Sequence, residues 1–117
     1  MALSYFINRK KATCVITFTG SITANDAEQL DLCLSETNLE PARHVILNLG
    51  GLKSVETDAY RALTLFQQGI RARSKLYLCD LLPEPAKVLK TAGVVRDSEI
   101  FADLMTALQA ILNSEKG

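Results

Sequence analysis

A short, nearly continuous apolar run at residues 43–49 (RHVILNL) limits the fold more than any other part of the sequence. A strand that lacks alternating polar residues must be covered on both faces, as in the parallel sheets of α/β proteins. Pro41 precedes the run, and Gly50 and Gly51 follow it. We therefore expect a central strand between helical layers, and we expect the two glycines to allow a sharp exit from that strand.

The rest of the chain alternates between strand and helix patterns. Residues 3–9 and 12–19 are rich in apolar and β-branched side chains, which predicts a hairpin whose second strand ends at Gly20. Four helices are predicted: from the cap residues 23–25 to near Thr37, at 58–73, at 83–92 before Gly93, and after Asp103. Two further strands are predicted at 75–81 and 99–101. The tail at 113–117 is expected to fray. This order, β-β-α-β-α-β-α-β-α, predicts a single α/β domain over residues 1–117, with a mixed sheet of four to five strands covered by about four helices.

Charge and cysteine usage narrow the classes of function. The 13 basic and 13 acidic residues give a formal net charge of zero, so no global field favours nucleic acid or an anionic membrane. No apolar stretch approaches the roughly 20 residues that span a bilayer, and no signal-peptide pattern opens the sequence. Cys14, Cys33 and Cys79 are widely spaced in apolar stretches and are expected to be buried thiols. We therefore expect a cytoplasmic protein in a reducing compartment.

The sequence offers little material for catalysis. His44 is the only histidine and is expected to be a packed or surface side chain, and no Cys-x-x-Cys, His-x-x-x-His or Gly-x-Ser-x-Gly motif occurs. Glu56 and Asp58 flank Thr57 without a histidine, lysine or metal cluster nearby in sequence, which disfavours acid/base chemistry. We therefore expect a protein that is not an enzyme, needs no cofactor or metal, and works by binding a protein partner.

The segment 47–59 (LNLGGLKSVETDA) resembles the functional turn of STAS domains (sulphate transporter and anti-sigma factor antagonist). In that family, a buried strand of the form apolar-x-Leu-Asp-Leu-Ser-Gly leads through an apolar residue to Asp-Ser-Ser-Gly, which a helix follows. Asn48 stands at the strand carboxylate, Gly51 at the glycine and Val55 at the apolar position, while residues 56–59 (ETDA) replace Asp-Ser-Ser-Gly.

Two further segments extend the resemblance over nearly the whole chain. Residues 18–23 (FTGSIT) resemble the family's Gly-Glu-Leu-Asp turn after the second strand, and residues 89–94 (LKTAGV) resemble its Leu-x-x-x-Gly-Leu helix end. The resemblance implies a STAS-like fold and a role in bacterial transcription regulation. In antagonists of this family, a kinase that is also an anti-sigma factor phosphorylates the first serine of the turn; the unmodified protein binds that kinase, and the modified protein is released.

Transferred to this sequence, the resemblance implies that Thr57 is the phosphoacceptor of a partner switch. The turn, the start of the following helix and one residue of the earlier turn are the expected partner-binding residues: Ser54, Val55, Glu56, Thr57, Asp58, Tyr60, Arg61 and Thr23. A phosphate at a helix N-terminus would meet the positive end of the helix dipole.

Several alternatives remain open at this point. Glu56 and Asp58 can keep a degenerate turn permanently acidic, or Thr57 can simply cap the helix by accepting the N–H of Ala59 or Tyr60. The chain can also be a STAS interaction subunit of a larger complex, such as a stress-sensing assembly or a lipid-transport system, or a nucleotide- or lipid-binding module without phosphorylation. A homodimer is left open as well.

Overall fold

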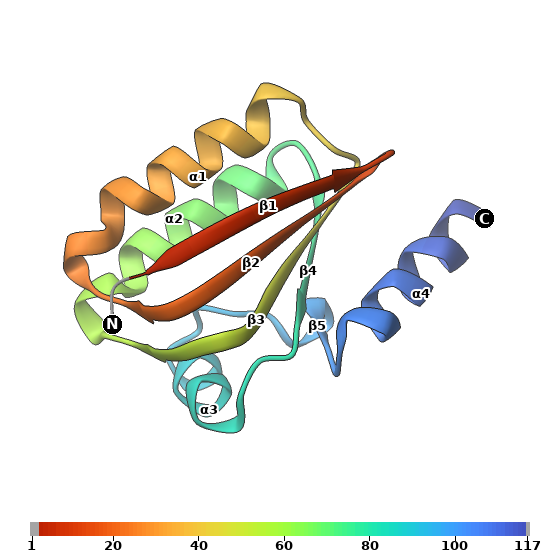
Figure 1. The fold of residues 1–117 in the computed structure, drawn as a ribbon. Coiled ribbons are helices and arrows are strands. Elements are labelled where there is room, and N and C mark those ends of the chain that lie inside the picture. Colours follow the sequence, from red (N-terminus) through yellow and green to blue (C-terminus); the bar gives the residue numbers. More distant parts are fainter. Residues whose placement is uncertain (1–2, 117) are drawn as a thin grey trace.

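A five-stranded mixed sheet in the order β1-β2-β3-β4-β5 lies at the centre of the computed structural model, which describes residues 3–116 (Figure 1). The strands are β1 (Ser4–Lys10), β2 (Thr13–Ile22), β3 (His44–Val55), β4 (Lys75–Cys79) and β5 (Ile100–Phe101). The helices are α1 (Ala27–Leu39), α2 (Tyr60–Arg71), α3 (Pro83–Thr91) and α4 (Leu104–Lys116), with 3-10 turns η1 (Ala24–Asp26), η2 (Thr57–Ala59) and η3 (Asp97–Glu99). Only β1 is antiparallel to its neighbour, so the predicted mixed α/β sheet with four helices is confirmed.

Two apolar cores lie on the two faces of the sheet. Helices α1 and α2 lie side by side against one face and α4 lies against the other (Figure 1). The central strand supplies both cores, because Val45 and Leu47 are buried on the α1–α2 side and Ile46 is buried on the α4 side. This arrangement confirms that the apolar run is a strand covered on both faces.

The three cysteines are buried free thiols, as predicted. Burial raises the pKa of Cys33 and of Cys79 to about 12, and it also raises the pKa of Cys14. These thiols therefore stay protonated at neutral pH and act as small apolar side chains of the core.

Two strands continue past the glycines at which the sequence predicted that they would end. Gly20 does not end β2, because a positive φ of 92° and local register shifts let the strand continue to Ile22. Gly50 and Gly51 are not an exit either, since β3 continues to Val55. A Cβ at Gly51 would lie 2.8 Å from the Thr19 Cγ2 atom, so this glycine permits close approach of β2 and β3 at the irregular part of their pairing.

The chain end predicted to fray is helical instead, because α4 runs to Lys116; Gly117 lies outside the described residues. Asp103 caps this helix as predicted, accepting the Thr106 N–H at 2.8 Å. Near the other end, the Glu115 carboxylate accepts from His44 Nε2 at 2.8 Å and from Arg43 Nη1 at 3.0 Å. His44 is a packed side chain, and its Nδ1 is hydrogen-bonded to the Tyr77 hydroxyl at 3.0 Å. These bonds attach the last turn of α4 to the sheet.

Replacing Glu115 with glutamine is expected to lower the unfolding temperature more at pH 7 than at pH 3. The hydrogen bond from His44 is the main cause that lowers the pKa of Glu115 below its ordinary value of 4.5. A lowered folded-state pKa contributes stability above the unfolded-state value, and that stability is lost as the pH falls through the folded-state value. Thermal unfolding of wild type, Glu115→Gln and a control, Glu28→Gln, at both pH values tests this. An equal difference between wild type and Glu115→Gln at the two pH values would contradict it.

Candidate docking surface around Thr57

Parallel pairing of β2 and β3 brings two separate predicted segments to one edge of the sheet. Ile22 at the end of β2 pairs with Val55 at the end of β3, and the Glu56 N–H donates to the Ile22 carbonyl at 2.9 Å. The Ser54 hydroxyl donates to the Ser21 hydroxyl at 2.9 Å across the same pair. The residues that follow the two strands, Thr23 and the turn at 56–59, are therefore neighbours in space.

Thr23 is engaged in local structure. Its backbone N–H and its hydroxyl both donate to Asp26 Oδ2, at 2.8 and 3.0 Å, and its hydroxyl accepts the Asn25 N–H at 3.2 Å. This reciprocal capping box begins η1 and confirms the predicted cap at 23–25. The Thr23 side chain is thereby held in one place beside the turn.

Thr57 is the first residue of η2, and its hydroxyl is exposed. The alternative that this hydroxyl caps the helix is not what the structure shows, since it forms no capping hydrogen bond. The Ala59 N–H donates to the Glu56 carbonyl at 2.9 Å, and the Tyr60 N–H donates to the Thr57 carbonyl, so backbone acceptors have taken both donors. Backbone carbonyls of the 3-10 turn accept these two N–H groups at the start of the helix, which leaves the Thr57 side chain without a capping role.

The charges around Thr57 are unneutralised within the domain. Glu56 and Asp58 are exposed, and neither forms an ion pair with any residue in 3–115, where side chains are described. Arg61 is exposed one residue into α2. The turn is therefore a solvent-facing edge that carries two carboxylates, with Arg61 at the start of the following helix.

Two half-buried side chains lie on either side of the turn. Val55 and Tyr60 both pack partly against the main core, whereas Ala59 between them is fully buried and fixes η2 against the domain. Half-buried aromatic and apolar groups beside an exposed turn are typical of the anchors in protein interfaces. We use the name Thr57 surface for the predicted set Ser54, Val55, Glu56, Thr57, Asp58, Tyr60, Arg61 and Thr23.

Helix α3 adds residues that the sequence did not indicate. A hollow of about 220 Å³ lies between residues 53–55 and the α3 residues Glu84, Pro85, Val88 and Leu89. A second hollow, of about 510 Å³, lies between Tyr60 and the same helix. Val88 borders both hollows and is 42% exposed. The one signal in the sequence was that Val88 falls outside the face that Pro85 and Leu89 bury.

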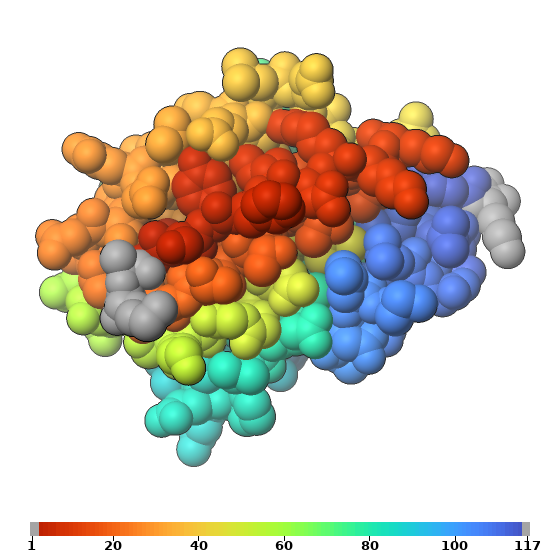
Figure 2. Space-filling view, viewed as in Figure 1, coloured from red at the N-terminus to blue at the C-terminus, as the bar shows by residue number. Residues whose placement is uncertain are grey.

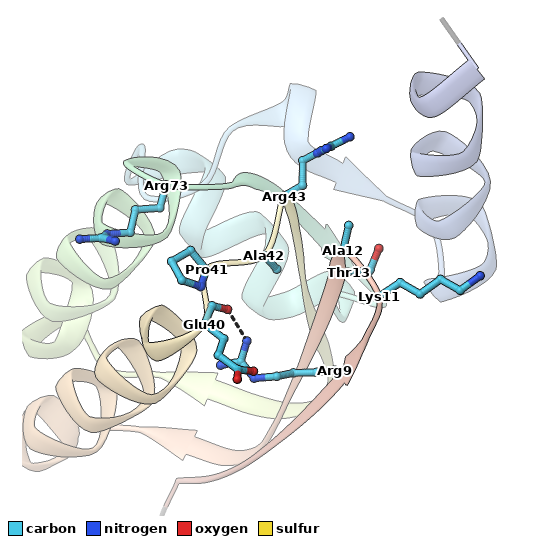
Figure 3. A pocket seen from close by; sticks show the side chains of 9 residues that line it. All are labelled: Arg9, Lys11, Ala12, Thr13, Glu40, Pro41, Ala42, Arg43 and Arg73. Carbon is cyan, nitrogen blue, oxygen red and sulfur yellow. Dashed lines mark hydrogen bonds between the residues drawn. The ribbon is translucent and has the colours of Figure 1, made fainter.

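Arg71, Arg73 and Lys75 lie at the end of α2 and just after it, where a group of cations can be a solvated helix end or a phosphate or lipid site. Arg71 forms a bidentate pair with Glu99, at 2.7 and 2.8 Å. Arg73 borders a hollow of about 480 Å³ with three other cations, but Lys11, Arg43 and Arg73 point away from one another (Figure 3). Arg9 donates to carbonyls at the end of α1, among them that of Glu40. The cations do not converge, so the solvated reading fits the geometry better.

Within residues 3–116, no group of histidine, cysteine and acidic side chains has the arrangement of a metal site. No helix in this part of the chain is long and apolar enough to cross a bilayer.

Comparison with known proteins identifies the domain. The STAS domain family model matches residues 6–107. A search of curated proteins found no significant match. Solved structures with the same fold include the anti-sigma factor antagonist SpoIIAA in its unphosphorylated form, at 15% identity and a TM-score of 0.74, covering 94% of this chain and 97% of that one. Bacillus SpoIIAA in its phosphorylated form matches at 16% identity and a TM-score of 0.68, covering 92% and 99%.

Two other solved structures show how widely the fold is used. A serine-to-glutamate variant of RsbS from Moorella thermoacetica matches at 13% identity and a TM-score of 0.77, covering 97% of this chain and 98% of that one. A sulfate transporter family protein from Wolinella succinogenes matches at 17% identity and a TM-score of 0.78, covering 91% and 89%. At these identities the likeness establishes the fold and not the function. Because the family model covers most of the chain, this protein belongs to the STAS domain family.

Proposed function

We propose that the Thr57 surface binds a serine/threonine kinase that acts as an anti-sigma factor, and that phosphorylation of Thr57 by this kinase releases it. The observation that carries the proposal is the state of the Thr57 hydroxyl. It is exposed on a short turn, and the backbone already satisfies the donors that it was expected to cap. The hydroxyl is therefore accessible to a kinase, and its modification leaves the hydrogen bonds of the turn intact.

The chemistry of the switch needs only ATP and the kinase. The γ-phosphoryl group passes to Thr57 Oγ1, the hydroxyl proton is lost, and ADP leaves. The product carries about −1.5 to −2 charges at neutral pH. Glu56 and Asp58 already occupy the flanking positions without ion-pair partners among the side chains of residues 3–115, so the phosphate adds to a negative edge. Solvent screening keeps the cost to the free domain small.

The same phosphate is costly in a complex. A partner that contacts Val55 and Tyr60 must also cover the exposed Thr57 between them. Covering a threonine removes little hydration, whereas covering a phosphate without counter-charges removes the hydration of a dianion. The modification therefore weakens docking while it leaves the fold unchanged. The existence of SpoIIAA structures in both the phosphorylated and unphosphorylated forms is in keeping with this proposal.

Replacing Thr57 with alanine is expected to abolish phosphate incorporation. The protein is incubated with ATP and a candidate histidine-kinase-like ATPase encoded beside it in the genome, and the incorporated phosphate is located by mass spectrometry. Wild type and Ser35→Ala, which removes an exposed hydroxyl on α1, are expected to take up one phosphate per chain. Incorporation that persists in Thr57→Ala would place the modification elsewhere and overturn the assignment.

The permanent acidity of the turn favours a second candidate function. Glu56 and Asp58 give the surface charge without a kinase, which suits a STAS subunit that docks constitutively in a larger complex, such as a stress-sensing assembly or a lipid-transport system. Affinity purification that recovers such subunits and no kinase would support this alternative. A thermal shift with nucleotide that survives changes at Thr57 would instead support a ligand-binding module.

A further inference from the structure

The face of the sheet opposite α1 and α2 is only partly covered. Helix α4 packs on this face against β3, β4 and β5, where Ile46, Tyr77, Cys79, Ala107 and Ile111 form the second core. The hairpin β1–β2 extends past the helix, and Phe6 on β1 is 66% exposed. Figure 2 shows the red and orange hairpin beside the blue α4. A hollow of about 560 Å³, which we name the α4 groove, lies between them.

One wall of the α4 groove is an apolar stripe. Leu104, Leu108 and Leu112 follow one another at intervals of four residues along α4, and Val15 faces them from β2. The stripe is about 12 Å long, because eight helical rises of about 1.5 Å separate Leu104 from Leu112. Leu112 is 57% exposed, so this wall faces solvent rather than another part of the domain.

The end of the groove near the β1–β2 turn is polar and mainly cationic. Lys10, Lys11, Arg43 and Glu115 lie there, beside the last turn of α4. Glu115 is already held by Arg43 and His44. Lys10 and Lys11 form no ion pair with any other side chain described between residues 3 and 115. The groove therefore combines an apolar trough with two available cations at one end.

We propose that the α4 groove binds a medium-chain fatty acid. The carboxylate pairs with Lys10 and Lys11, and the alkyl chain lies along Leu112, Leu108 and Leu104. The volume falls within the range of about 300–1,000 Å³ that is usual for small-molecule sites, and a mostly apolar wall with a few polar groups at one end is their usual composition. The length of the stripe selects a chain of intermediate length.

Charge favours this occupant over a second copy of the chain. A two-fold dimer that buried the groove would bring the unpaired Lys10 and Lys11 of both copies into one interface, where they would repel each other. A fatty acid supplies the missing negative charge and the apolar surface in one molecule. The site is also separate from the Thr57 surface, because Lys10 and Lys11 lie near the first residue of β3 and Thr57 follows its last residue. The proposal therefore does not rest on the partner switch.

Titration of the full chain with sodium laurate below its micelle concentration, followed by calorimetry, tests the proposal. We expect saturable binding of one laurate per chain, weaker binding of dodecanol, which has the same tail without the charge, and no binding of butyrate. Leu112→Asp places a carboxylate on the apolar wall of the groove, at an exposed position where the fold should tolerate it. It is expected to weaken laurate binding at least about tenfold. The double variant Lys10→Glu, Lys11→Glu is expected to weaken laurate binding and to leave dodecanol binding unchanged.

Two matched variants control for general effects. Leu65→Asp changes a leucine on α2 that is 51% exposed, and Lys90→Glu reverses an exposed lysine on α3; both are expected to bind laurate like wild type. Absence of saturable laurate binding would overturn the proposal. Binding that Leu112→Asp and the lysine reversal leave unchanged would also overturn it. A concentration-dependent dimer that Leu112→Asp dissociates, in a protein that does not bind laurate, would assign the groove to a second copy instead.

Discussion

Replacing Phe66 with alanine is expected to lower the free energy of unfolding by about 3–5 kcal/mol. Phe66 is buried on α2, and its ring centroid lies 5.6 Å from that of Phe18 on β2. The contact between the two rings holds α2, the helix that follows the Thr57 turn, against the sheet. A single domain of this size has a total stability of about 5–15 kcal/mol, so the change removes a large part of it.

Urea denaturation followed by circular dichroism measures the effect of Phe66→Ala. Leu65→Ala is the matched control, because the neighbouring side chain is on the same helix and half exposed. Its effect is expected to stay within about 0.5 kcal/mol, as for most surface substitutions. Equal losses in the two variants would contradict the placement of Phe66 in the main core and of Leu65 at its surface.

Replacing Thr57 with glutamate is expected to weaken kinase binding by about 10- to 100-fold, which corresponds to about 1.4–2.8 kcal/mol. The new carboxylate stands beside Glu56 and Asp58, and a partner that covers the turn must desolvate all three. The fold is expected to tolerate the change, because the Thr57 side chain is exposed and does not cap the helix.

Ser35→Glu is the control for the added charge, because Ser35 is an exposed residue of α1, away from the Thr57 surface. Surface plasmon resonance with immobilised kinase gives both affinities, and thermal unfolding shows whether either variant is destabilised. If Thr57→Glu binds as tightly as wild type while both proteins stay folded, docking does not involve the Thr57 turn.

The sequence predicted the arrangement of elements because each one carries its own periodicity. The run at 43–49 lacks alternation and is buried on both faces, and the helical spacing of Leu63, Phe66 and Ile70 matches the buried face of α2. These patterns come from burial, which acts along each segment separately. Element order then left few arrangements of the sheet.

Features that depend on neighbouring strands were not predictable in the same way. Gly20 and Gly51 suggested strand ends, but they permit irregular pairing and close approach of β2 and β3, which only the assembled sheet reveals. Likewise, residues 113–117 were expected to fray because they are polar, whereas Glu115 is held by two side chains more than 70 positions away. Long-range polar contacts of this kind leave no local periodic signal.

The candidate site shows the same division. The segment 47–59 indicated the turn and the residue Thr57, because the resemblance depends on local order along the chain. The sequence left open whether Thr57 caps the helix, since the choice between a side-chain cap and a 3-10 turn depends on local backbone geometry. The contribution of Val88 was missed because α3 reaches the Thr57 surface only through the tertiary fold.

Titration of the kinase with two forms of the same protein tests the partner switch most directly. One form is unmodified, and the other carries phosphate on Thr57, with the position verified by mass spectrometry. We expect the unmodified protein to bind the kinase at least about tenfold more tightly than the phosphorylated protein, with the difference removed by phosphatase treatment. Equal affinity of the two forms, with both folded, would contradict a switch at Thr57.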